Sequence, residues 1–204
     1  MAGILANFRN TVILSVILAL LVVGAYATGP QGAGPIFLQA VFRWLHVFFG
    51  ILWIGLLYYF NFVQIRKMPE IPAELKPAVS KYIAPEALFW FRWAALATVL
   101  MGLAIAGSRG YLAETLTLGF AGGYNPALDM QYALLGLGMW LGIIMMLNVW
   151  GIIWPNQKRA LGIVEADADT KAKSARMAML GSRTNLLLSI PMLASMKMSQ
   201  TLFS

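Results

Sequence analysis

The sequence has no cysteine and a single histidine among its 204 residues. Without cysteine, the chain cannot form a disulfide, an iron–sulfur cluster, a thiolate zinc site or a C-x-x-C-H attachment for c-type haem. Charge is also scarce, because only 11% of the residues are charged, against roughly a quarter in a soluble domain. Eight acidic and fifteen basic residues cannot cover a water-soluble surface of this size. The composition excludes a soluble globular domain, a disordered chain and a conventional nucleic-acid-binding protein.

What the chain has instead is apolar sequence, with 60% hydrophobic residues and a mean hydropathy of +0.73. The lipid bilayer is therefore its expected solvent. A membrane helix needs roughly 20 apolar residues, and five stretches qualify as candidates: 11–28, 36–65, 87–107, 131–154 and 185–203. The sequence predicts an all-α, polytopic membrane helix bundle with about five transmembrane helices. Residues 1–204 form one integral membrane domain in this interpretation.

The distribution of basic residues predicts the orientation of the bundle. If all five segments span and the N-terminus is cytoplasmic, the outer loops carry only Arg109. The cytoplasmic segments then carry eleven basic residues: Arg9, Arg66, Lys67, Lys76, Lys81, Lys158, Arg159, Lys171, Lys173, Arg176 and Arg183. The positive-inside rule thus predicts an N-terminus inside and a C-terminus outside. Arg9 and the A-Y-A at 25–27 also resemble a signal peptide, but the long apolar core favours a retained helix.

Polar residues within an apolar helix are costly and usually face the bundle interior. In the second segment they recur at helical spacing, as Arg43, His46, Gly50, Leu57, Asn61 and Gln64. His46 lies roughly 15 Å inward from Ile36 at 1.5 Å per residue. A neutral imidazole can ligate haem iron or another metal, or relay protons. The alternative, which we favour for a lone histidine, is a structural side chain that hydrogen-bonds a neighbouring helix.

Three neighbours of His46 complete a candidate pocket for haem b or a quinone. Arg43 would neutralise a haem propionate or hold a quinone oxygen, Gly50 would let a flat cofactor approach, and Trp53 would form a wall. The simpler alternatives are that Arg43 extends to the outer interface and that Gly50 serves helix packing. Methionine could supply a second haem ligand, although methionine at helical spacing more often fills a core.

Two further polar residues have simple interpretations. Arg92 is expected to extend between aromatic rings at the cytoplasmic end of the third segment. Asn148 is expected to hydrogen-bond Asn61 across helices. No H-E-x-x-H, P-loop or G-x-S-x-G motif occurs, and no carboxylate pair sits inside a helix, which argues against a carboxylate-based proton pump.

Four motifs, in order along residues 40–200, resemble a known family. They are R-W-L-H-V at 43–47 with G-I-L-W-I-G at 50–55; W-F-R-W at 90–93 with L-M-G at 100–102; N-V at 148–149 with I-I-W-P-N-Q-K at 152–158; and residues 176–193, from Arg176 through Asn185 and Leu186 to I-P-M-L. Together they resemble the membrane domain of bacterial urate hydroxylases, the urate oxidase N-terminal domain family. The resemblance implies a helical domain of the bacterial inner membrane in a bioenergetic setting.

The chain departs from this family in its histidines. Family members carry further histidines on later helices, often with a cytochrome c domain, whereas only His46 carries over here, with Arg43 beside it. This difference favours an accessory or structural subunit that packs on other membrane subunits or on copies of itself. The alternative is an oxidoreductase or electron-transfer subunit that binds one b-type haem, with His46 as iron ligand, or a quinone. A small transporter is disfavoured, because paired discontinuous helices are not evident.

Overall fold

The computed structural model describes residues 2–30, 32–121 and 125–203, and within these ranges the chain is helical without strands. The long helices are α2 (Phe8–Ala27), α3 (Pro35–Tyr58), α6 (Ala84–Ser108), α8 (Pro126–Asn148) and α10 (Ala168–Leu202). The short helices are α1 (Ala2–Leu5), α4 (Ile65–Lys67), η2 (Met68–Glu70, a 3₁₀ turn), α5 (Lys76–Ala78), α7 (Leu112–Leu116) and α9 (Trp154–Ala160). Three π-helical turns continue the long helices: η1 (Tyr59–Gln64), η3 (Val79–Ile83) and η4 (Val149–Ile153).

The predicted helical membrane bundle is confirmed. Four continuous helical stretches of the described chain are long and apolar enough to cross a membrane, namely Phe8–Ala27, Pro35–Glu70, Lys76–Ser108 and Asp129–Ala160. They match the first four predicted segments, the first to within three residues at either end, and the other three extend beyond the prediction by up to eleven residues at one end. In these three the extension arises because the π turns η1, η3 and η4 connect α3, α6 and α8 to the short helices beside them without a break.

The fifth predicted segment needs correction. Residues 185–203 belong to a helix that begins at Ala168, and this helix is not among the four that qualify by length and apolarity. The physical reason is an inverted pattern: the buried face of α10 is small and polar, whereas its apolar residues point outward. Leu187 and Ile190 are 74% and 63% exposed. The buried face consists of Ser174, Ala178, Gly181, Ser182, Asn185, Ser189, Met192, Ser195 and Ser199.

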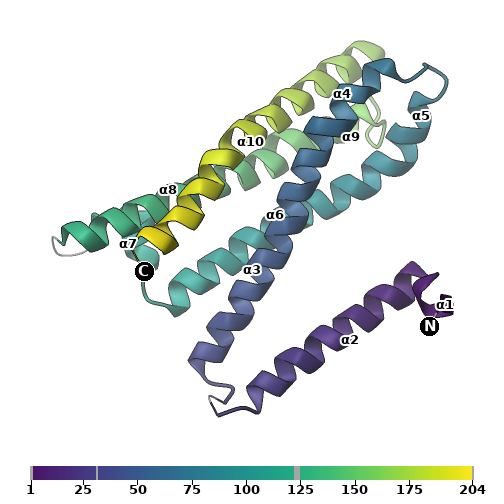
Figure 1. Cartoon of the computed structure of the whole chain (residues 1–204). Coiled ribbons are helices and arrows are strands. Elements are labelled where there is room, and N and C mark those ends of the chain that lie inside the picture. Colours follow the sequence, from purple (N-terminus) through teal and green to yellow (C-terminus); the bar gives the residue numbers. More distant parts are fainter. Residues whose placement is uncertain (1, 31, 122–124, 204) are drawn as a thin grey trace.

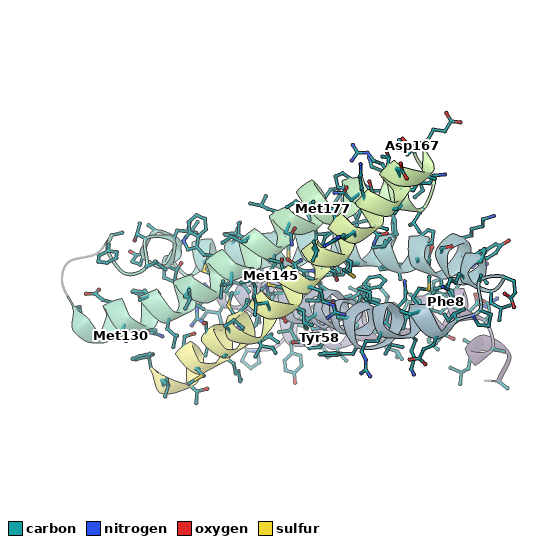
Figure 2. The ribbon with its side chains drawn as sticks, turned by 90° about the horizontal axis from the view of Figure 1, so that it is seen from above. Phe8, Tyr58, Met130, Met145, Asp167 and Met177 are labelled. Carbon is teal, nitrogen blue, oxygen red and sulfur yellow. The ribbon has the colours of Figure 1, made fainter. Side chains whose placement is uncertain are left out.

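Helix α10 nevertheless runs the length of the bundle beside α8. Figure 1 shows its last turn near α7, at the opposite end from α9, and Figure 2 shows α10 passing α8 where Met145 is labelled. Its first turn is capped by Asp167, which accepts hydrogen bonds from the Thr170 amide and hydroxyl. These bonds hold the pKa of the Asp167 carboxyl below its ordinary value.

An amide network joins α8 to α10 in the bundle interior. Asn148 Nδ2 donates to Asn185 Oδ1 at 2.7 Å and to the Gly181 carbonyl at 2.8 Å. Asn185, fully buried, donates in turn to the Met145 carbonyl at 3.0 Å. The expected Asn148–Asn61 bond is therefore wrong: Asn61 Nδ2 donates to Ser182 Oγ at 2.8 Å. Both asparagines use α10 as partner, because its small serines and Gly181 allow the backbones to approach closely.

Helix α2 lies apart from the bundle formed by α3, α6, α8 and α10 (Figure 1). None of its 20 residues is buried, and residues such as Leu20 and Leu21 are at least 60% exposed. Because a helix this apolar cannot face water, its surface is covered by lipid or by another protein.

The first prediction concerns topology, and the absence of cysteine makes it directly testable. In intact cells, a membrane-impermeant maleimide should label single-cysteine variants at Thr28 and Thr201, which lie on the predicted outer side. Variants at Glu74 and Glu165 should react only after the membrane is permeabilised. If the Thr201→Cys protein behaves like the Glu165→Cys protein, α10 does not cross the bilayer.

The second prediction concerns the amide network. Asn185→Ala should lower the free energy of unfolding by about 1–2 kcal/mol, because it removes two interhelical hydrogen bonds from a buried site. Thr184→Ala is the matched control, since Thr184 is exposed and bonds only within its own helix. Reversible unfolding in mixed micelles measures both. Equal stability of the Asn185→Ala and Thr184→Ala proteins would show that the network does not hold α10 in place.

Candidate functional site

His46 is fixed to the neighbouring helix by its Nδ1 atom. Its ring, on α3, reaches the Thr98 carbonyl on α6 with an Nδ1···O distance of 2.8 Å. A carbonyl oxygen only accepts hydrogen bonds, so Nδ1 must carry the hydrogen. In the neutral ring the lone pair then resides on Nε2. Among the described residues no hydrogen bond reaches Nε2, so this atom is free to bind a ligand.

A glycine on α6 makes room for the imidazole. A Cβ atom built on Gly102 would lie 3.0 Å from His46 Cε1 and 3.1 Å from Nδ1. The ring therefore rests against bare backbone, one turn from the carbonyl that it bonds. The ring can reach the Thr98 carbonyl because α6 passes close to α3: a Cβ atom built on Gly50, on α3, would lie 3.7 Å from the Thr98 methyl group.

His46 lines a cavity of about 400 Å³ between α3, α6, α8 and α10. This volume lies within the range of small-molecule sites. Three of its lining residues, Val47, Ile51 and Leu193, are 52%, 70% and 43% exposed, so the cavity opens sideways between α3 and α10. In a membrane protein this opening faces the acyl chains of the bilayer. A ligand dissolved in the lipid can enter without crossing water.

The rest of the cavity lining is largely apolar and includes flexible methionine side chains. Helices α8 and α10 contribute three methionines, Met139, Met192 and Met196, while Trp53 on α3 contributes an indole that is 1% exposed. The Trp53 Nε1–H is buried and has no hydrogen-bond partner among the described residues. Methionine side chains adapt readily to the shape of a ligand. None of the lining residues carries a formal charge.

The predicted pocket residues divide into two groups. His46, Gly50 and Trp53 do line one cavity. Arg43 does not; it lies close enough to Tyr111 to act on its phenol electrostatically. Burial raises the pKa of that phenol, while the nearby charges of Arg109 and Arg43 oppose the shift.

The absence of a charged lining residue decides between the two predicted cofactors. A haem carries two propionates, and a charge placed in an apolar site without a partner is costly. Arg43, the residue expected to neutralise a propionate, lies outside the lining. The cavity therefore does not fit haem b. It fits a neutral, lipid-soluble ligand with one hydrogen-bond donor for His46 Nε2.

Arg92 lies as predicted, away from this cavity. Its guanidinium carbon is 3.9 Å from the centroid of the Trp154 ring and 5.2 Å from that of Phe89. These contacts are cation–π interactions, so the side chain lies between aromatic rings as expected.

Sequence reasoning missed the partners of His46. Thr98 acts through its backbone carbonyl, which every residue possesses, so no side-chain signal marks it. Gly102 was visible only as part of the L-M-G motif. The methionines Met139, Met192 and Met196 are three of twelve, and only the packing of α8 and α10 distinguishes them.

No family model, curated protein or solved structure matches the chain, so its resemblance to the urate hydroxylase membrane domain stays a prediction.

The third prediction is that His46 is protonated at Nδ1 and unprotonated at Nε2 when its ring is neutral. Because the chain has one histidine, ¹⁵N spectra of the histidine-labelled protein report this ring alone. Gly102→Ala should disturb the ring, since the new methyl group would lie about 3.0 Å from Cε1. Gly107→Ala, on the same helix with open space around it, is the control. A wild-type ring protonated at Nε2 would contradict the hydrogen bond to Thr98.

Proposed function

We propose that the protein is a membrane subunit that binds a quinone-class ligand in the His46 cavity, preferentially in its reduced, hydroxyl-bearing form. The observation that carries the proposal is the unpartnered Nε2 lone pair of His46 at an apolar cavity that opens to the bilayer. A quinol hydroxyl is a neutral donor that matches this acceptor. The isoprenoid tail of such a ligand would leave through the opening lined by Val47, Ile51 and Leu193.

In this proposal, His46 binds the ligand as a hydrogen-bond acceptor. Thr98 holds the hydrogen on Nδ1, and Nε2 accepts a hydrogen bond from the ligand hydroxyl. The oxidised ligand carries carbonyls in place of hydroxyls and offers no donor. The structure thus supports selection between two redox forms of almost identical shape by a single hydrogen bond.

The accessory role expected from the sequence is compatible with this site, and one observation favours it. Helix α2 has 20 residues, most of them apolar and none buried, away from the bundle, and offers an attachment surface for another membrane subunit. We place the protein in a larger complex of the bacterial inner membrane, in keeping with the family resemblance. Partner subunits would then exchange electrons with the ligand.

The fourth prediction compares the two redox forms of a short-tailed quinone. Wild-type protein in nanodiscs should bind decylubiquinol roughly five- to tenfold more tightly than decylubiquinone, because one neutral hydrogen bond contributes about 1–1.5 kcal/mol. His46→Ala should remove this preference while it leaves quinone binding nearly unchanged. Equilibrium titration under anaerobic conditions measures the four affinities.

Two steric variants test the location independently of hydrogen bonding. Gly142 lines the cavity, and a Cβ atom built on it would have no atom within 4 Å, so Gly142→Leu should fill part of the cavity and weaken both redox forms. Gly151→Leu, also in open space but outside the cavity, should bind as the wild type. Equal affinities of wild type for the two forms, or a stoichiometric b-type haem spectrum lost in His46→Ala, would refute the proposal.

A further inference from the structure

Three π-helical turns lie around a second cavity, at the cytoplasmic end of the bundle. The turns η1, η3 and η4 belong to three different helices, and each contributes to the lining: Phe60 and Gln64, Ser80, and Ile153, respectively. A π turn inserts one extra residue into a helix; such turns are rare, and they frequently lie at functional sites. The enclosed volume is about 560 Å³, larger than that of the His46 cavity.

The interior of this cavity is apolar. Phe60, Leu88, Phe91 and Ile153 form its deep wall, and each is at most 7% exposed. The Phe60 and Phe91 rings meet edge to face, with centroids 5.6 Å apart, so the wall is firmly packed. This part of the cavity suits a hydrocarbon chain.

The lining carries one charge, the ammonium of Lys76, and it also includes the polar residues Gln64, Ser80 and Gln157. Within the described chain, Lys76 Nζ has neither an ion-pair partner nor a hydrogen bond. Lys67 shows the contrast, because its Nζ is 2.8 Å from Glu70 Oε2. A half-buried cation beside an apolar chamber favours an anionic group at its side.

The surrounding surface reinforces this preference. Residues 66–86 and 156–183, which form the cytoplasmic end, carry ten basic and six acidic side chains, a net charge of +4. A positive surface at the membrane boundary attracts anionic amphiphiles.

We propose that this second cavity binds an anionic amphiphile, with its carboxylate or phosphate on Lys76 and its acyl chain in the chamber walled by Phe60, Phe91 and Ile153. The site is separate from the His46 cavity and does not depend on the function proposed there. The ligand is either a free fatty acid or an anionic bilayer lipid, since both combine one anionic head with an acyl chain.

The fifth prediction tests the head group. In native mass spectrometry from a neutral detergent, one oleate should bind per chain at low micromolar concentrations. Lys76→Gln should weaken oleate about tenfold, whereas Lys81→Gln, an exposed change on the same segment outside the lining, should not. Oleyl alcohol, which has the same chain without the charge, should bind wild type about as weakly as oleate binds Lys76→Gln.

A second pair of variants tests the apolar part of the cavity by reducing its volume. Ala175→Phe places a ring at the cavity and should weaken oleate and oleyl alcohol alike; Ala172→Phe, equally exposed on α10 but outside the lining, should not. Circular dichroism confirms that each variant is folded. Competition by phosphatidylglycerol would identify a bilayer lipid as the source, and failure to compete would identify a free fatty acid.

Three outcomes would overturn the proposal. One is equal weakening by Lys76→Gln and Lys81→Gln, which would indicate unspecific attraction to a basic surface. Another is equal binding of oleate and oleyl alcohol to the wild type, a comparison that needs no variant. The third is that neither oleate nor phosphatidylglycerol binds at a defined stoichiometry.

Discussion

The structure depends on one constraint: within the bilayer, a polar side chain must find its hydrogen-bond partner inside the protein, on its own helix or on a neighbouring one. Asn148 and Asn185 meet this requirement together, and their bonds fix α10 against α8 at its middle. Because these partners are short side chains and backbone carbonyls, the two helices approach closely, and Gly181 has Ile153 and Asn148 directly against it. The apolar residues of α10 are left to face outward, as the surrounding lipid requires.

The same constraint explains the orientation of His46. A neutral imidazole has one donor and one acceptor, and the Thr98 carbonyl satisfies only the donor. The remaining acceptor, Nε2, borders an apolar cavity, and no described side chain donates a hydrogen bond to it. An acceptor that lacks a hydrogen-bond donor in an apolar site indicates a ligand more strongly than the cavity volume alone, because leaving the acceptor unpaired costs free energy.

The sequence predicted the long helices well, because apolar runs identify any helix that lipid surrounds. It was less accurate for α10, because a hydropathy average combines the outward apolar face of the helix with its inward polar face. Exposed Leu187 and buried Ser189, for example, enter the same average. Of the site, His46, Gly50 and Trp53 were predictable from spacing on one helix. Thr98, Gly102 and the methionines belong to other helices, and their approach depends on packing that no single-helix pattern contains. Arg43 was misplaced for the same reason: proximity along α3 does not decide which side chains share a cavity.

Helix α10 is 35 residues long, about 52 Å at 1.5 Å per residue, so it extends well beyond a hydrocarbon core of about 30 Å. Its N-terminal half, at Ala175 and Ala178, forms part of the second cavity, which Lys76 lines, and its C-terminal half, at Met192 and Met196, forms part of the His46 cavity. The asparagine pair holds it between these two points. Because one helix lines both cavities, a tilt of α10 about the asparagine pair would change the space in both of them together.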